Sequence, residues 1–133
     1  MGKIDEMIDG IILSPLKIIG HEKGDIMHII KSSDAGFKKF NEAYISKINY
    51  DQIKGWKKHF KMTCNFIVPI GSIKIVVYDD RENSKTKNTF NEFNLSCKNY
   101  CRLTVPNGLW YGFMGISINQ SMLINISDIL HCK

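Results

Sequence analysis

Alternation of apolar and polar side chains in the middle of the chain is the feature that most limits the possible fold. From Trp56 to Phe66 apolar residues occupy every second position, with one lysine as the exception, and the positions between them are polar. A strand with two unlike faces produces this period of two. Pro69 and Gly71 interrupt the pattern before Ser72–Tyr78 resumes it, as Pro and Gly do in β structure. The sequence therefore predicts two consecutive strands here.

Short apolar or alternating segments, separated by Pro, Gly and Asn turns, recur along the chain. They are Ile11–Leu13, Leu16–Ile19, Ile26–Lys31, Glu42–Asn49, Cys101–Val105, Leu109–Ile116 and Ser121–Ile126. The polar segment Glu82–Asn94 shows no strand pattern before Phe93. Many short strands between turns are typical of an all-β sandwich or barrel, and jelly-roll closure limits exposed edges. The length of 133 residues predicts a single domain over residues 1–133.

The composition narrows the classes of protein to consider. No apolar run approaches the ~20 residues that cross a membrane, and the N-terminus lacks a secretory pattern, so we expect a cytoplasmic protein without a membrane partner. The formal charge of +5 is scattered and accompanies no nucleic-acid-binding motif, so nucleic acid is not expected either. The four cysteines form no CxxC pair, which favours reduced structural thiols.

Two basic side chains on the polar face of the central strand are candidate chemical groups. Lys57 and His59 stand two residues apart, so we expect both to face the barrel interior and Trp56 and Phe60 to face the opposite way. A lysine in a cavity can lose its proton, and a histidine titrates near neutrality. A solvated strand face with ordinary charges is the open alternative. A metal site is disfavoured, because a protonated lysine is a poor ligand.

Three motifs, in order, resemble those of the dTDP-4-dehydrorhamnose 3,5-epimerase family of cupins. They are His21–Asp25, Ile53–His59 followed by Val77–Arg81, and Val105–Phe113. The family has an Asp-Glu-Arg-Gly-like turn, an Arg-Gly-Leu-His-Tyr-Gln motif, an Asp-x-Arg strand end and a Val-Pro-x-Gly-x-x-His-Gly-Phe turn. The resemblance runs from about Gly10 to Asn125 and implies an RmlC-like cupin jelly-roll barrel.

The resemblance also implies a reaction and an assembly. The family removes a proton α to the C4 ketone of a nucleotide-linked 4-keto-6-deoxy sugar and returns it on the other face, without metal or nicotinamide. We therefore expect a sugar-nucleotide epimerase or isomerase of deoxysugar and surface-polysaccharide biosynthesis, with no cofactor and a nucleotide-linked sugar as its ligand. Family members are usually dimers, and a homodimer would cover the apolar segment Ile11–Ile19 if that segment is an edge.

The chain departs from the family at the catalytic positions. The family's catalytic histidine falls on Lys57, the glutamine two residues on falls on His59, and the histidine of the third motif is Tyr111. Related ketoisomerases carry the second of two histidines at the His59 position. The family's tyrosine is expected in the last strand, where this chain has Met122–Asn125. A catalytically inactive module that only binds the sugar nucleotide is therefore the alternative function.

We predict His59 and Lys57 as the catalytic residues. A histidine is largely neutral at pH 7, whereas a lysine needs a strongly depressed pKa, so His59 is the better base and Lys57 the better partner for an enolate. The predicted substrate-binding residues are phosphate ligands, an aromatic surface and one histidine: His28, Lys54, Arg81, Arg102 and Tyr111. Strand capping, a half-buried histidine and core packing are their structural alternatives. His131, almost at the terminus, is assigned no role.

Overall fold

The computed structural model describes residues 6–131, and this part of the chain is all-β. Its strands are β1 (Ile12–Pro15), β2 (Ile18–Ile19), β3 (Ile26–Met27), β4 (Glu42–Ile48), β5 (Ile53–Lys58), β6 (Cys64–Ile70), β7 (Ser72–Asp79), β8 (Thr89–Ser96), β9 (Cys101–Val105), β10 (Trp110–Gly115) and β11 (Ser121–Ser127). Within residues 6–131 the chain has no helix that could span a membrane. The all-β prediction is confirmed.

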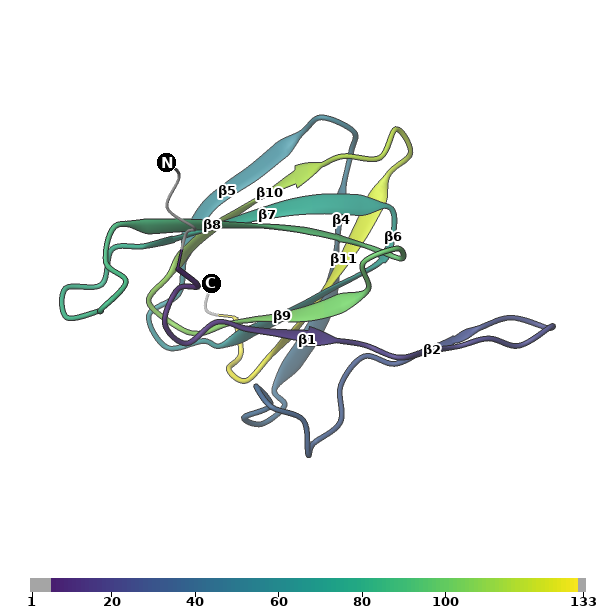
Figure 1. Ribbon diagram of the computed structural model, residues 1–133, viewed down its shortest axis with the longest axis horizontal. Coiled ribbons are helices and arrows are strands. Elements are labelled where there is room, and N and C mark those ends of the chain that lie inside the picture. Colours follow the sequence, from purple (N-terminus) through teal and green to yellow (C-terminus); the bar gives the residue numbers. More distant parts are fainter. Residues whose placement is uncertain (1–5, 132–133) are drawn as a thin grey trace.

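The strands form two larger sheets and a small hairpin. One sheet has the order β1-β9-β6-β11-β4, the second has the order β5-β10-β7-β8, and β2 pairs with β3. All these strand pairs are antiparallel. Figure 1 shows the two larger sheets facing each other and the β2–β3 hairpin extending away from them. Strands β4 and β5 are sheet edges, so a seam without strand pairing lies between them.

The core lies between the inner faces of the two larger sheets. On β7, Ile73, Ile75 and Val77 are fully buried and alternate with half-buried residues. Every second side chain of β7 therefore points into the core, as the alternating sequence of this strand predicted. Apolar side chains of β6, β9 and β11 meet them from the facing sheet.

The outer face of the five-stranded sheet is covered by the segment that follows β3. The carbonyl oxygens of Ile29 and Ala35 accept hydrogen bonds from Arg102 on β9, at 2.7 and 3.3 Å. The Gly36 carbonyl accepts another from the side chain of Asn65 on β6, at 3.2 Å. This cover explains why β6 and β9 are buried on both faces for five consecutive residues.

The alternation from Trp56 to Phe66 is not one strand, so that part of the prediction is wrong. Strand β5 ends at Lys58 in the four-stranded sheet, and β6 begins at Cys64 in the five-stranded sheet. The intervening residues turn the corner between the sheets, where the His59 carbonyl accepts a hydrogen bond from the Gly108 amide at 2.7 Å. The apolar positions of the pattern differ in burial: Trp56 is 54% and Phe60 78% exposed, whereas Met62, Cys64 and Phe66 are buried.

Candidate functional site

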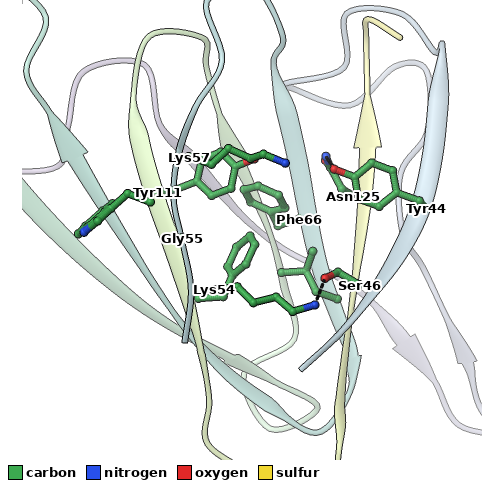
Figure 2. A pocket seen from close by; sticks show the side chains of 11 residues that line it. Tyr44, Ser46, Lys54, Gly55, Lys57, Phe66, Tyr111 and Asn125 are labelled. Atoms are coloured by element: carbon green, nitrogen blue, oxygen red, sulfur yellow. Dashed lines mark hydrogen bonds between the residues drawn. The ribbon is translucent and has the colours of Figure 1, made fainter. Parts of the chain in front are cut away.

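A cavity of about 240 Å³ opens between the two larger sheets, beside the seam between β4 and β5. Its polar lining comes from both sheets and comprises Tyr44, Ser46, Lys54, Lys57, Tyr111 and Asn125. Apolar residues of β5, β6, β10 and β11 complete it: Gly55, Trp56, Phe66, Phe113 and Leu123. Figure 2 shows Lys57 and Tyr111 on one side and Tyr44 and Asn125 on the other. This arrangement suits a small polar ligand with an apolar surface.

Glycine at position 55 allows the wall of the cavity to form. A Cβ atom at Gly55 would lie 2.8 Å from the Cα of Gly112 on the neighbouring strand β10, closer than real Cβ contacts allow. Gly55 also has a φ of 149°, in the region that favours glycine. The close approach of β5 to β10 places Lys54 and Lys57, on either side of the glycine, at the cavity.

The charged side chains that line the cavity, among the described residues, are Lys54 and Lys57. The Lys54 ammonium donates to the Ser46 hydroxyl at 3.1 Å and to the Lys47 carbonyl at 2.7 Å, so it bridges the seam between β5 and β4. Lys57 extends from β5, where its register partner is Tyr111 on β10. Two ammonium groups give the cavity a positive character that favours an anionic ligand or a developing negative charge.

His59 reaches the cavity through Tyr111. Its Nε2 atom lies 2.8 Å from the Tyr111 hydroxyl, which lines the cavity, whereas His59 itself is half-buried behind it. Burial, followed by the charges of Lys57 and His131, lowers the pKa of His59. Burial raises the pKa of Tyr111 well above its ordinary value. Near neutral pH the pair is therefore an unprotonated imidazole and a protonated hydroxyl, and the tautomer with a bare Nε2 accepts the hydroxyl proton.

His131, to which the sequence analysis assigned no role, joins this group. Its Nε2 atom lies 3.4 Å from the Lys57 ammonium, and its ring is edge-on to that of His59, with the centroids 5.5 Å apart. The backbone amide of His131 donates to the Glu42 carboxylate at 3.0 Å, which fixes the segment after β11 at the start of β4. No motif marks this residue, because its proximity to Lys57 depends entirely on the pairing of β11 with β4.

The wall formed by the five-stranded sheet is uncharged. The Asn125 side-chain amide donates to the Tyr44 hydroxyl at 3.2 Å and to the Cys64 thiol at 3.7 Å. Burial raises the pKa of Tyr44 and raises that of Cys64 to about 12. The thiol is therefore protonated, which argues against a nucleophilic role for Cys64. Sequence analysis singled out neither Tyr44 nor Asn125 as a site residue.

Three residues predicted to bind substrate do not line the cavity. Arg102 is only 2% exposed, and its guanidinium bonds the Asp34 carboxylate at 3.3 Å besides the two carbonyls described above. Because it has almost no surface to offer a phosphate, the structure corrects the assignment of Arg102 to a structural residue. His28 follows β3, and its backbone amide donates to the Lys17 carbonyl at 3.0 Å, away from the cavity.

Arg81 is also engaged elsewhere. It forms two bonds to the buried Asp79 carboxylate, at 2.9 and 3.0 Å, and one to the Asp9 carbonyl at 2.7 Å. Burial favours the protonated Asp79, but hydrogen bonds from Arg81, Ser84 and Thr86 outweigh it and hold the pKa well below its usual range. Arg81 therefore stabilises Asp79 and does not line the cavity, and its role as a phosphate ligand stays a prediction. Residues 6–131 contain no group of three or more His, Cys, Asp or Glu side chains placed to hold a metal.

Comparison with proteins of known sequence gives two curated relatives, although no protein-family model matches the chain. The chain is 26% identical over 118 residues to the probable low-salt glycan biosynthesis epimerase Agl13 of Haloferax volcanii, covering 87% of this chain and 76% of that protein. It is 28% identical over 107 residues to the spore coat polysaccharide biosynthesis protein SpsL of Bacillus subtilis, covering 80% and 71%.

Solved structures share the same fold. A dTDP sugar isomerase from Desulfovibrio desulfuricans G20 superposes with a TM-score of 0.92 and is 35% identical, covering 95% of this chain and 81% of its own. A dTDP-4-dehydrorhamnose 3,5-epimerase from Bacillus anthracis, with TDP and PPi bound, has a TM-score of 0.84 and 20% identity, covering 97% and 78%. The first similarity extends to sequence, whereas the second is one of fold.

Proposed function

Because this chain belongs to the dTDP-4-dehydrorhamnose 3,5-epimerase family of cupins, we propose that it isomerises a nucleotide-linked 4-keto-6-deoxyhexose. The cupin jelly-roll prediction is confirmed, and the chain is an enzyme of isomerase type in sugar-nucleotide metabolism. The observation that carries the proposed reaction is the His59–Tyr111 pair beside the Lys57 ammonium at one cavity. A base and a cation at one place are what enolate formation requires.

Proton abstraction is the first step that this geometry supports. The proton α to the C4 ketone leaves carbon for the Tyr111 oxygen, while the Tyr111 proton passes to the neutral His59 Nε2 at 2.8 Å. The C–H electron pair forms the enolate, whose oxygen is stabilised by the Lys57 ammonium. His59 is thus the proposed base and Lys57 the electrostatic partner, as expected from the sequence. A free tyrosinate does not accumulate, because the raised pKa of Tyr111 disfavours it.

Lys54 and Tyr111 are the predicted substrate-binding residues that line the cavity, and we retain both. Lys54 lies at the seam, where its ammonium is accessible and already close to Ser46. A phosphate oxygen would find a cation and a hydroxyl together there. We therefore propose that a nucleotide-linked sugar enters at the seam with its phosphates toward Lys54.

Assembly, domain organisation and location follow as further parts of the proposal. Strand β1 is an edge of the five-stranded sheet, and the adjoining hairpin exposes Ile18, Ile19 and Ile26. We propose that a homodimer covers this edge, and sedimentation showing a monomer at micromolar concentration would contradict it. We further propose one domain over residues 1–133, and a cytoplasmic location that suits the free thiols among the described cysteines.

Hydrogen exchange with solvent tests the reaction. Incubation with a dTDP-4-keto-6-deoxyhexose in deuterated water should introduce deuterium at C3 or C5. His59→Asn should lower the exchange rate 10²- to 10⁴-fold, the usual worth of a general base, and leave ligand binding largely intact. Lys57→Met should impair both exchange and binding. His21→Asn, in an exposed turn, is the matched control and should change neither.

The outcomes separate enzyme from binding module. Exchange that survives in His59→Asn but vanishes in Lys57→Met would make the lysine the base and reverse the two roles. Binding without any exchange in the unmodified protein would identify a module that holds the sugar nucleotide but does not transform it. That result would refute the proposed reaction while leaving the family assignment unchanged.

A further inference from the structure

Epimerisation requires a proton donor on the wall opposite His59 and Tyr111. The inference that follows rests on the proposed function. Tyr111 belongs to β10 in the four-stranded sheet, so a proton returned through Tyr111 arrives on the face from which it left and restores the original configuration. Inversion needs a donor from the five-stranded sheet. The last strand, where the family resemblance places a tyrosine, offers Leu123 and Asn125 to the cavity instead.

Tyr44 is the tyrosine that the five-stranded sheet offers from another strand, whereas the Ser46 hydroxyl, which also lines the cavity, accepts a hydrogen bond from Lys54. Tyr44 lies on β4, directly opposite Asn125 on the neighbouring strand β11. The Tyr44 side chain lines the cavity and, in Figure 2, lies across it from Tyr111 and Lys57. A ligand between the two sheets would therefore have one tyrosine hydroxyl on each side.

The hydrogen bonds of Asn125 orient the Tyr44 hydroxyl. The side-chain oxygen Oδ1 of Asn125 accepts a hydrogen bond from the backbone amide of Asn65 at 3.2 Å. This bond distinguishes the oxygen from the nitrogen of the buried Asn125 side-chain amide. Its nitrogen must then face Tyr44, and it donates to the Tyr44 oxygen at 3.2 Å. Because the Tyr44 oxygen accepts this hydrogen bond, the hydroxyl proton of Tyr44 must point away from Asn125. Tyr44 lines the cavity, so the proton can point into it.

We propose that Tyr44 is the second proton-transfer residue, and that the enzyme is an epimerase that inverts a carbon α to the ketone. The Tyr44 O–H bond breaks and its proton bonds to carbon on the face opposite Tyr111, while the enolate electrons return to carbon and the carbonyl reforms. The tyrosinate left behind keeps the hydrogen bond from Asn125, which stabilises its charge. Solvent water then reprotonates Tyr44 and takes the abstracted proton from His59.

The surroundings of Tyr44 keep its hydroxyl protonated until it donates. Burial raises its pKa, so the hydroxyl is protonated when substrate binds. The His131 ring packs edge-on against Tyr44 with centroids 5.8 Å apart, and the Lys57 ammonium lies 3.4 Å from His131. The charged groups near the ring are thus Lys57 from β5 and Glu42 from β4 itself, while His59 and His131 are the neighbouring imidazoles.

Tyr44→Phe tests the proposal, because it removes the hydroxyl and keeps the ring. Deuterium exchange into recovered substrate and formation of inverted product are measured separately with a dTDP-4-keto-6-deoxyhexose. We expect exchange within about threefold of the unmodified protein, since abstraction through Tyr111 is intact, and product formation slower by 10²- to 10⁴-fold. Tyr50→Phe, which alters an exposed tyrosine outside the cavity, is the matched control and should change neither rate.

Each other outcome has a defined meaning. Inverted product formed by Tyr44→Phe at the normal rate would overturn the role of Tyr44 alone. Loss of exchange together with product would place Tyr44 in proton abstraction or binding and would also overturn it, as would a ketoisomer as the sole product. Absence of exchange in the unmodified protein would instead refute the proposed function on which this inference rests.

Discussion

Removal of the Tyr111 hydroxyl separates a catalytic role from a structural one, because the two roles predict losses of different size. Tyr111→Phe keeps the ring that packs against Phe66 and Phe113, with centroids 5.1 and 5.3 Å away. What disappears is one hydrogen bond of 2.8 Å to His59. Such a bond contributes about 1 kcal/mol to stability. The unfolding entropy of a 133-residue chain is roughly 0.28 kcal/mol/K, so the Tm should fall by about 4 °C.

The catalytic loss should be much larger. If the Tyr111 hydroxyl carries the proton between substrate and His59, its removal should slow exchange by 10²- to 10⁴-fold, equivalent to about 3–5 kcal/mol in the barrier. Exchange is followed by mass spectrometry of the sugar nucleotide in deuterated water, and the Tm by calorimetry on the same preparation. Tyr78→Phe removes a hydroxyl that bonds Asn88 outside the cavity and serves as the control. Exchange within about fivefold of normal, with a Tm lowered by a few degrees, would refute the proton path through Tyr111.

Three other predictions concern stability and pH. Asp79→Asn should reduce the free energy of unfolding by about 3–5 kcal/mol. The pKa of Asp79 is lower in the folded than in the unfolded protein, so Asp79 stabilises the fold above its unfolded pKa of about 4 and stops doing so in acid. The variant should therefore lose less stability than the unmodified protein as the pH falls below about 4. Arg102→Met should cost a similar amount in a denaturant titration without raising KM; a raised KM with unchanged stability would restore its role as a ligand. As the pH is lowered, the exchange rate should stay constant through the pH range in which an ordinary histidine is protonated, and it should fall only at the lower pKa of His59. An exchange rate that falls at or above the ordinary range would contradict this.

Much of the fold could be predicted from alternating or wholly apolar strands, and the strand that was missed, β8, has polar residues at half of its inner positions. In β8 the residues on the inner parity are Thr89, Asn91, Phe93 and Leu95, and the first two are polar. The Asn91 side chain accepts the backbone amide of Ile8 at 2.7 Å, so it ties down the N-terminal segment instead of filling the core. Because this inward-facing residue is polar, the sequence of β8 does not alternate between apolar and polar residues, and the strand could not be recognised from its pattern.

The site was predictable only where the recognised sequence motifs contribute its residues. Lys54, Lys57 and Tyr111 come from two motifs on adjacent strands and do meet at one cavity. Charge alone misplaced Arg102, because the carbonyls that occupy its guanidinium belong to a segment far away in the sequence. Tyr44 was missed for the same reason, since its function depends on a strand in the facing sheet.

Substitution of His131 tests whether the end of the chain positions Lys57. His131→Gln supplies an uncharged carbonyl oxygen that can accept a hydrogen bond from the Lys57 ammonium in place of Nε2. Exchange at pH 7 should stay within about threefold of normal, because the acceptor is preserved. The pKa of His59 should rise, since His131 contributes to lowering it, and the acid limb of the rate should move to higher pH. His131→Leu removes the acceptor and should slow exchange about tenfold, the effect of roughly 1.4 kcal/mol of lost positioning. Equal rates in the two variants would show that Lys57 does not depend on His131.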